Sequence, residues 1–194
     1  MPPLRMAVNL SGHHIRQANF IDHIEEILKD TGIAFNALEI EMTENSVMGH
    51  VNDSIMALTD LKIRGISLAI DDFGTGYSSL SYLQHFPVNT LKIDKSFVAS
   101  INVNKGGTSI VDAIVAMAQG LNLNLIAEGV ETDPQLDYLR SLGCAEIQGW
   151  LFGKAESEQV TRKMLERKRD GETIRASEVA YKNEPLANEG GNVR

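Results

Sequence analysis

Short apolar runs alternate with longer amphipathic stretches along most of the chain, and this alternation predicts the fold. Six runs of five to seven residues have the length and composition of buried strands: 6–10, 37–42, 67–72, 90–94, 123–128 and 146–152. Between them, apolar residues recur three and four positions apart, the spacing of a helix face, in 20–32, 53–65, 109–121 and 134–143. Glycines 32, 65, 120 and 143 fall at the expected helix ends. This repeated strand-then-helix order predicts an α/β fold with a parallel sheet and right-handed crossovers.

Composition indicates one globular domain followed by a different kind of segment. The 194 residues are 43% hydrophobic and 23% charged, values typical of a globular protein, and they suffice for one core but hardly for two. From about residue 167 the chain becomes polar and aperiodic, with a glycine pair. We therefore expect a domain over 1–166 and a flexible tail over 167–194.

Charge and cysteine content narrow the class of partner. The formal net charge is −8, from 26 acidic and 18 basic residues, which argues against binding a nucleic acid polymer. A small phosphate ligand remains compatible, because a bound cation can bridge acidic side chains to phosphate oxygens. The single cysteine, Cys144, excludes an intramolecular disulfide and fits a reducing cytoplasm. No apolar run reaches the ~18 residues needed to span a bilayer, so we expect a cytoplasmic domain without a membrane span.

Polar side chains stand at or near the C-terminal end of every predicted strand. They are Asn9, Glu41, Asp71 and Asp72, Lys92 and Asp94, Glu128, and Gln148. One such residue could be a simple strand-end cap, but in parallel α/β folds this edge of the sheet binds ligands, and six consecutive strands carry one. Carboxylate and amide oxygens suit Mg²⁺ or Mn²⁺, and two such ions ~3.5–4 Å apart can clamp a phosphodiester.

The adjacent pair Asp71 and Asp72 is explained if cations lie between the two carboxylates, while Gly74 and Gly76 let the following loop turn. Other interpretations are weaker. The segment 71–80 lacks the third glycine of a dinucleotide-binding loop and follows two acids that would repel a pyrophosphate. The adjacent histidines His13 and His14 are better interpreted as a solvated helix start than as a metal site.

Six segments carry a resemblance to a known family: "VNLS" (8–11), "LEIEMTE" (38–44), "DDFGTGYSSL" (71–80), "LKIDKSFV" (91–98), "IAEGVET" (126–132) and "IQGWLFGK" (147–154). In this order and spacing they make the chain resemble the EAL domain, the cyclic di-GMP phosphodiesterase domain of bacterial signalling proteins. The resemblance implies a TIM-type (β/α)₈ barrel, usually a homodimer, that hydrolyses one phosphodiester of cyclic di-GMP to give pGpG.

The resemblance also implies roles for individual residues. Asn9, Glu41 and Asp71 would ligate a first metal ion and Asp72 a second. Lys92 resembles the catalytic lysine that orients or activates the attacking water, with Asp94 beside it. Glu128 and Gln148 would lie close to the waters of the site, Glu128 as a catalytic and Gln148 as a substrate-binding residue, like Asp94. Glu44 resembles the glutamate that steadies the loop carrying the aspartate pair.

Two departures from the family pattern matter. Ala155 replaces a proline, a minor change, and the Glu-Ala-Leu tripeptide, whose glutamate is a metal ligand, occurs nowhere in the sequence. Six strands correspond to barrel strands three to eight, so we expect an incomplete barrel with about six of eight βα units, two unpaired edges, an apolar interior and a tendency to oligomerise. Three hypotheses remain: a metal-dependent phosphodiesterase domain, a catalytically deficient module that binds cyclic di-GMP or regulates a partner, and a remnant without function.

Overall fold

The computed structural model describes residues 4–17, 19–48, 51–76, 83–101 and 105–169. The chain forms two compact units, Met1–Leu151 and Phe152–Arg194. The first unit contains the sheet and the site, and the described part of the second contains helix α9 (Glu158–Arg169). The predicted flexible tail lies outside the described residues from position 170 onward, and α9 extends to Arg169.

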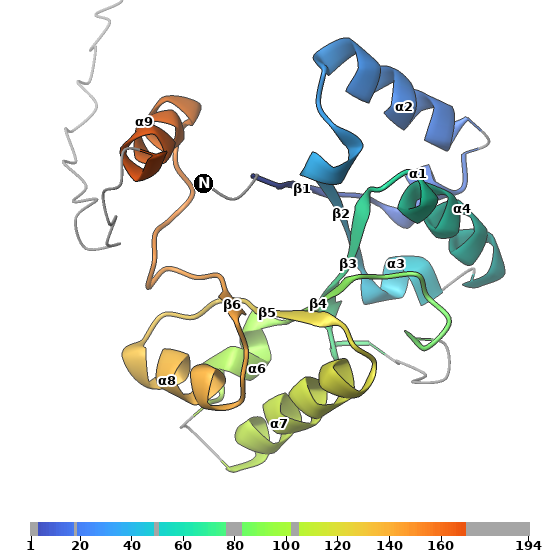
Figure 1. Cartoon of the computed structure of the whole chain (residues 1–194). Coiled ribbons are helices and arrows are strands. Elements are labelled where there is room, and N and C mark those ends of the chain that lie inside the picture. Colours follow the sequence, from blue (N-terminus) through green and yellow to red (C-terminus); the bar gives the residue numbers. More distant parts are fainter. Residues whose placement is uncertain (1–3, 18, 49–50, 77–82, 102–104, 170–194) are drawn as a thin grey trace, which may run out of the picture. The chain divides into compact units, whose positions relative to one another are not determined.

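All six predicted strands form, and they build one parallel sheet. Their bounds are β1 Met6–Asn9, β2 Leu38–Thr43, β3 Ser67–Phe73, β4 Thr90–Ile93, β5 Asn124–Ala127 and β6 Glu146–Ile147. Neighbours in the sheet are neighbours in the chain, and each pair is parallel. The sheet curls into an incomplete barrel with helices on its outer side, as Figure 1 shows, so the predicted partial barrel is confirmed.

Strand β6 is shorter than predicted because the chain turns at Gly149. A Cβ atom at this position would lie 2.1 Å from the carbonyl oxygen of Val130, so only glycine fits so close to that backbone. The adjacent backbone is still paired, since the Val130 amide donates to the Gln148 carbonyl at 3.1 Å.

The four predicted helices are also confirmed, as α2 (Phe20–Thr31), α4 (Val51–Ile63), α7 (Lys105–Gly120) and α8 (Asp133–Ser141). The sequence patterns did not reveal α1 (Gly12–Ile15), α3 (Glu44–Met48), α6 (Lys95–Ala99) or the 3₁₀ turn Phe35–Ala37. Elements of three to five residues are too short to show a helical period. Within the described residues, no helix combines the length and apolar character needed to cross a membrane.

The two faces of the sheet differ sharply in polarity. One face packs its apolar side chains into the core shared with the helices, and these are Ile40, Met42, Leu68, Ile70, Leu91 and Ile93. On β1 to β4 the other face carries polar or small residues at the intervening positions, because side chains alternate along a strand. Among them Glu39, Glu41, Ala69, Thr90 and Lys92 are buried. The expected apolar barrel interior is therefore wrong for β1 to β4, whose larger apolar side chains lie on the face toward the helices, whereas on β5 the apolar Ile126 lies beside Lys92 on the inner face.

Strands β1 and β6 are the two ends of the sheet, as expected for an open barrel. All four residues of β1 are exposed, and the side chains of Met6 and Val8 are 61% and 45% exposed. Because successive side chains of a strand point to opposite faces, the exposure of all four residues means that β1 is covered on neither face in the described structure.

Candidate active site

A bulge in β3 presents Asp71 and Asp72 together. Ile70 pairs with Leu91 and Phe73 with Ile93, so three steps along β3 match two along β4, and both aspartates lie opposite Lys92. Side chains of adjacent strand residues normally point to opposite faces, and a bulge removes that constraint. Asp72 adopts a left-handed backbone with φ 53°, a conformation that aspartate tolerates better than most residues.

Lys92 is buried at the centre of an acidic cluster. Its side chain is 4% exposed, and its Nζ atom lies 2.6 Å from Glu128 Oε1, 2.8 Å from Glu41 Oε1 and 3.4 Å from Asp71 Oδ1. The three carboxylates come from β2, from β3 and from the residue directly after β5. One ammonium group therefore joins acids contributed by three strands.

The net effect of burial and nearby charge is to raise the pKa values of three groups in the cluster, Lys92, Glu128 and Asp72. Burial alone would disfavour the Lys92 ammonium, but hydrogen bonds to Glu128 and Glu41 outweigh it and raise the pKa of Lys92. Burial raises the pKa of Glu128, against the effect of the bond from Lys92. The pKa of Asp72 is also raised, first by burial and then by the negative charges of Asp71 and Asp94.

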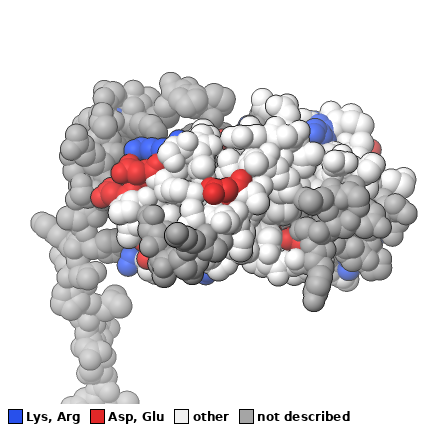
Figure 2. All heavy atoms as spheres, turned by 90° about the horizontal axis from the view of Figure 1, so that it is seen from below, with Lys and Arg blue, Asp and Glu red and all other residues white. Residues whose placement is uncertain are grey.

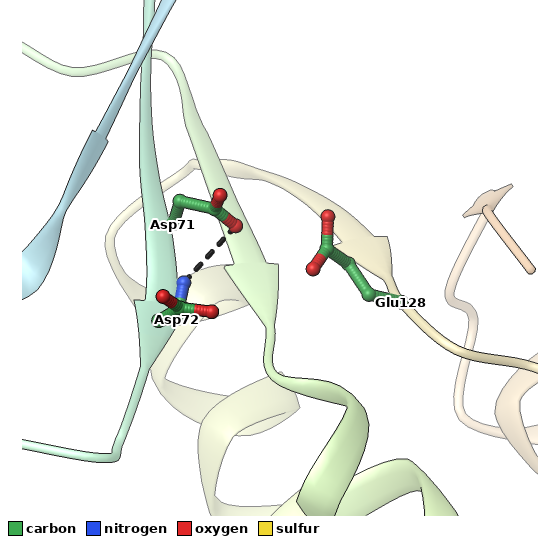
Figure 3. Close-up of side chains that lie close together, drawn as sticks. All are labelled: Asp71, Asp72 and Glu128. Atoms are coloured by element: carbon green, nitrogen blue, oxygen red, sulfur yellow. Dashed lines mark hydrogen bonds between the residues drawn. The ribbon is translucent and has the colours of Figure 1, made fainter. Parts of the chain in front are cut away.

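Three carboxylates of the cluster are arranged to hold a cation. Asp71, Asp72 and Glu128 each offer one oxygen, and these oxygens all lie within 4.8 Å of one another. Figure 3 shows the Asp71 and Glu128 carboxylates facing each other across β4, with the Asp72 amide donating to Asp71 Oδ1 at 3.0 Å. Oxygen donors at this spacing fit Mg²⁺ or Mn²⁺, which prefer carboxylates.

Asp94 links the cluster to helix α6. It is the N-cap of this helix and accepts hydrogen bonds from the Ser96 amide at 2.9 Å and from the Ser96 hydroxyl. These bonds stabilise the ionised Asp94, whose pKa is lowered although burial opposes this. Asp94 and Asp72 also share a hydrogen bond, in which Asp72, the group with the raised pKa, is the donor when protonated.

Glu44 holds the loop that follows the aspartate pair. It is 1% exposed, and its Oε2 atom accepts a hydrogen bond from the Gly74 amide at 2.9 Å. Gly74 has φ 92°, so a residue without Cβ is favoured where the loop turns. The other carboxylate oxygen of Glu44, Oε1, is buried and has no hydrogen-bond partner among the described residues. A Cβ atom at Gly76 would lie 2.7 Å from this oxygen, so a larger residue here would require the Glu44 side chain to shift.

Asn9 and Gln148 lie at the same edge of the sheet but outside the set of close contacts described above. Asn9 pairs with Glu41 in the β1–β2 register, so the two residues share a face, and the Asn9 side chain is exposed. Gln148 follows β6. Its backbone N–H donates a hydrogen bond to the Ala127 carbonyl at 2.8 Å, and its side chain is also exposed.

Glu39 is a second buried acid on β2, two residues before Glu41, and was not singled out from the sequence. Glu39 is 6% exposed, pairs with Arg5 at 3.2 Å and accepts a bond from Thr90 at 3.4 Å. Its position two residues before Glu41 was the available signal, because such residues share a strand face. Each of the two buried acids on β2 thus has its own basic partner.

Comparison with known proteins identifies relatives of this arrangement. The EAL domain family profile matches residues 1–155. Cyclic di-GMP phosphodiesterase NbdA of Pseudomonas aeruginosa is 44% identical over 151 residues, covering 78% of this chain and 19% of NbdA. The chain spans about a fifth of the length of the first curated relatives that it matches.

Solved structures agree with the sequence comparison. The PaMucR phosphodiesterase in complex with c-di-GMP superposes with a TM-score of 0.78 at 38% identity, over 81% of this chain and 64% of that one. The Klebsiella pneumoniae BlrP1 complex with manganese and cyclic di-GMP gives 0.73 at 31% identity, over 79% of this chain and 39% of that one. Both structures share the fold of this chain at more than 30% sequence identity.

Proposed function

Because the chain belongs to the EAL domain family, we propose that it carries out metal-dependent hydrolysis of cyclic di-GMP to pGpG in bacterial second-messenger signalling. The observation that carries this proposal is the convergence of Glu41, Asp71, Asp72, Lys92 and Glu128 at the C-terminal edge of the sheet. Relatives solved with cyclic di-GMP, and in one case also with manganese, support the ligand and the ion.

The donor set fits Mg²⁺ or Mn²⁺. We assign Asp71 and Asp72 to holding two ions, with Glu41 and Asn9 completing the first of them. When bound, two divalent ions would lower the pKa of a coordinated water and neutralise charge that develops on the phosphate. Glu44 would keep the aspartate pair in place through its bond to Gly74.

Lys92 and the remaining residues act on water and substrate in this proposal. The Lys92 ammonium can donate to the attacking water and orient it, and Glu128, 2.6 Å from the same ammonium, would lie close to that water. Asp94 and Gln148 lie at the rim of the same edge, where they would contact the nucleotide.

The alternative is a module that binds cyclic di-GMP or regulates a partner without hydrolysis. One observation favours it: the sequence contains no Glu-Ala-Leu tripeptide, so the metal ligand which the family resemblance assigns to that motif is not supplied by these residues. A site with one carboxylate fewer would hold its ions more weakly, and an ion displaced by ~1 Å can cost ~10²-fold in rate.

Partners and location complete the proposal. The exposed apolar side chains of β1 support association with a second copy of the chain. On the face drawn in Figure 2, coloured Lys and Arg side chains are scattered, which agrees with a net charge of −8 and with a small ligand instead of a nucleic acid polymer. The buried Cys144 is compatible with a cytoplasmic protein.

Product analysis tests the proposal. The chain is incubated with cyclic di-GMP in Mg²⁺, in Mn²⁺ or in EDTA, and pGpG is quantified by chromatography, with Asp71→Asn as the inactive control. Ion-dependent formation of pGpG supports hydrolysis. Calorimetric binding of cyclic di-GMP without product favours the binding module, and the absence of both binding and product contradicts each function.

A further inference from the structure

Lys92 occupies the position between carboxylates where a cation is expected. Of the three acids whose oxygens converge within 4.8 Å, two, Asp71 and Glu128, are ion-paired with Lys92. Glu41 joins the same ammonium at 2.8 Å. The lysine therefore contacts acids that lie on both sides of the candidate ion site.

These contacts decide the charge balance of the cluster. The Lys92 side chain is 4% exposed, and its ammonium lies 2.8 Å, 3.4 Å and 2.6 Å from carboxylate oxygens of Glu41, Asp71 and Glu128. A carboxylate of low exposure is strongly unfavourable without a positive partner, and removing one partner of a buried ion pair leaves the other uncompensated. Among the described residues, Lys92 is the basic side chain that forms ion pairs with Glu41, Asp71 and Glu128.

We propose that Lys92 is the resident cation of the metal-free site: its ammonium holds Glu41, Asp71 and Glu128 together until a divalent ion takes over the carboxylates. The inference rests on the metal-dependent function proposed above and adds a role for Lys92 before the reaction begins. Ion binding then exchanges one cation for another and does not have to order a set of mutually repelling acids.

Asp72 distinguishes the two states of the site. Its carboxylate belongs to the converging set, whereas the ion pairs that Lys92 forms within 4 Å are with Glu41, Asp71 and Glu128. With its left-handed backbone, Asp72 places a carboxylate oxygen within 4.8 Å of oxygens of Asp71 and Glu128. Asp72 is therefore the ligand that an arriving ion meets without displacing the lysine.

Thermal unfolding of Lys92→Met tests this role, with Lys95→Met as a matched control. Lys95 is exposed on the neighbouring helix, so this control removes the same charge and keeps the same size of side chain. In EDTA, Lys92→Met is expected to melt about 10 °C below the parent, since it leaves buried acids unpaired, whereas the control melts with the parent. At saturating Mn²⁺ the deficit closes to within about 3 °C.

Thermodynamic linkage adds a second readout. If the ion restores what the lysine supplied, Lys92→Met must bind Mn²⁺ more tightly than the parent, by at least about 10-fold in calorimetry. Equal melting of parent and variant in EDTA, or a deficit unchanged by Mn²⁺, would overturn the proposal. A parent that neither binds Mn²⁺ nor hydrolyses cyclic di-GMP instead contradicts the proposed function, and so separates the two failures.

Folding of the variant is the remaining concern, and the proposal makes a prediction for it. If Lys92→Met is unfolded in EDTA, refolding in Mn²⁺ should recover the parent's far-ultraviolet circular dichroism. A variant that stays unfolded at saturating Mn²⁺ refutes a role that an ion can replace, because the defect would then be one of packing.

Discussion

Asp71→Asn isolates the contribution of one carboxylate to ion binding with little change in shape. Asp71 forms an ion pair with Lys92 at 3.4 Å, and its Oδ1 atom accepts a hydrogen bond from the backbone amide of Asp72. The amide oxygen of asparagine can retain the second contact. Lys92 keeps its two shorter ion pairs, to Glu128 and Glu41.

The distances give the sign of the effect on the metal-free protein. At 3.4 Å and an effective dielectric constant of about 20, the lost attraction to Lys92 amounts to about 5 kcal/mol. The relieved repulsion is at least about 3.5 kcal/mol for each ionised partner whose oxygen lies within 4.8 Å, and Asp72 and Glu128 are two such partners. Relieved repulsion therefore matches or exceeds lost attraction, and the metal-free variant should be as stable as the parent.

Differential scanning fluorimetry with and without Mn²⁺ measures both consequences. An ion at 100 times its dissociation constant stabilises the parent by about 2.7 kcal/mol, which raises the melting temperature by roughly 5–10 °C for a chain of this size. Asp71→Asn should lose most of this increase while melting within a few degrees of the parent in EDTA. Asp60→Asn removes the same charge from α4, where Asp60 lies 3.9 Å from Arg64, and this control should keep the full increase.

Two results would refute this reasoning. Retention of the full Mn²⁺-dependent increase would show that Asp71 is not a metal ligand. A fall of more than about 10 °C in EDTA would show that attraction to Lys92 outweighs repulsion among the acids, contrary to the distances.

Three further predictions concern other residues of the site. Lys92→Ala should lower turnover of cyclic di-GMP by ~10²-fold or more while Mn²⁺ binding persists, and a drop of only a few-fold in a product assay would contradict a catalytic role. Burial, above all, raises the pKa values of Asp72 and Glu128. These two carboxylates therefore bind protons more tightly in the folded chain than in the unfolded one. The stability of the metal-free protein should thus fall as the pH rises above about 4. Stabilisation by Mn²⁺ should accordingly be greater at about pH 8 than at about pH 5.5 in melting experiments, and the reverse order would contradict this assignment. Glu44→Ala removes the 2.9 Å bond to Gly74, a hydrogen bond to a charged group worth about 1.5–3 kcal/mol, and should lower both the melting temperature and Mn²⁺ affinity, whereas an unchanged affinity would limit Glu44 to folding.

The sequence by itself determined the order of elements and the edge of the sheet that carries the chemistry. Apolar spacing and glycine positions predicted the six strands and the helices α2, α4, α7 and α8, because these signals arise from neighbours a few residues apart. Parallel strands bring their C-terminal ends to one edge, so polar residues at those ends could be grouped before any contact was known. Glu39 was missed although its spacing from Glu41 places both on one face.

Only the tertiary structure decided how these residues meet. The bulge that places Asp71 and Asp72 together opposite Lys92 depends on the register between β3 and β4, which is set by long-range packing and not by local sequence. The sequence suggested that a cation separates the two aspartates, whereas the structure shows a buried lysine ion-paired with Asp71, Glu41 and Glu128. Such a contact joins Lys92 on β4 to acids from β2, from β3 and from the residue after β5, and its strength comes from their shared burial, a property that exists only once the sheet has formed.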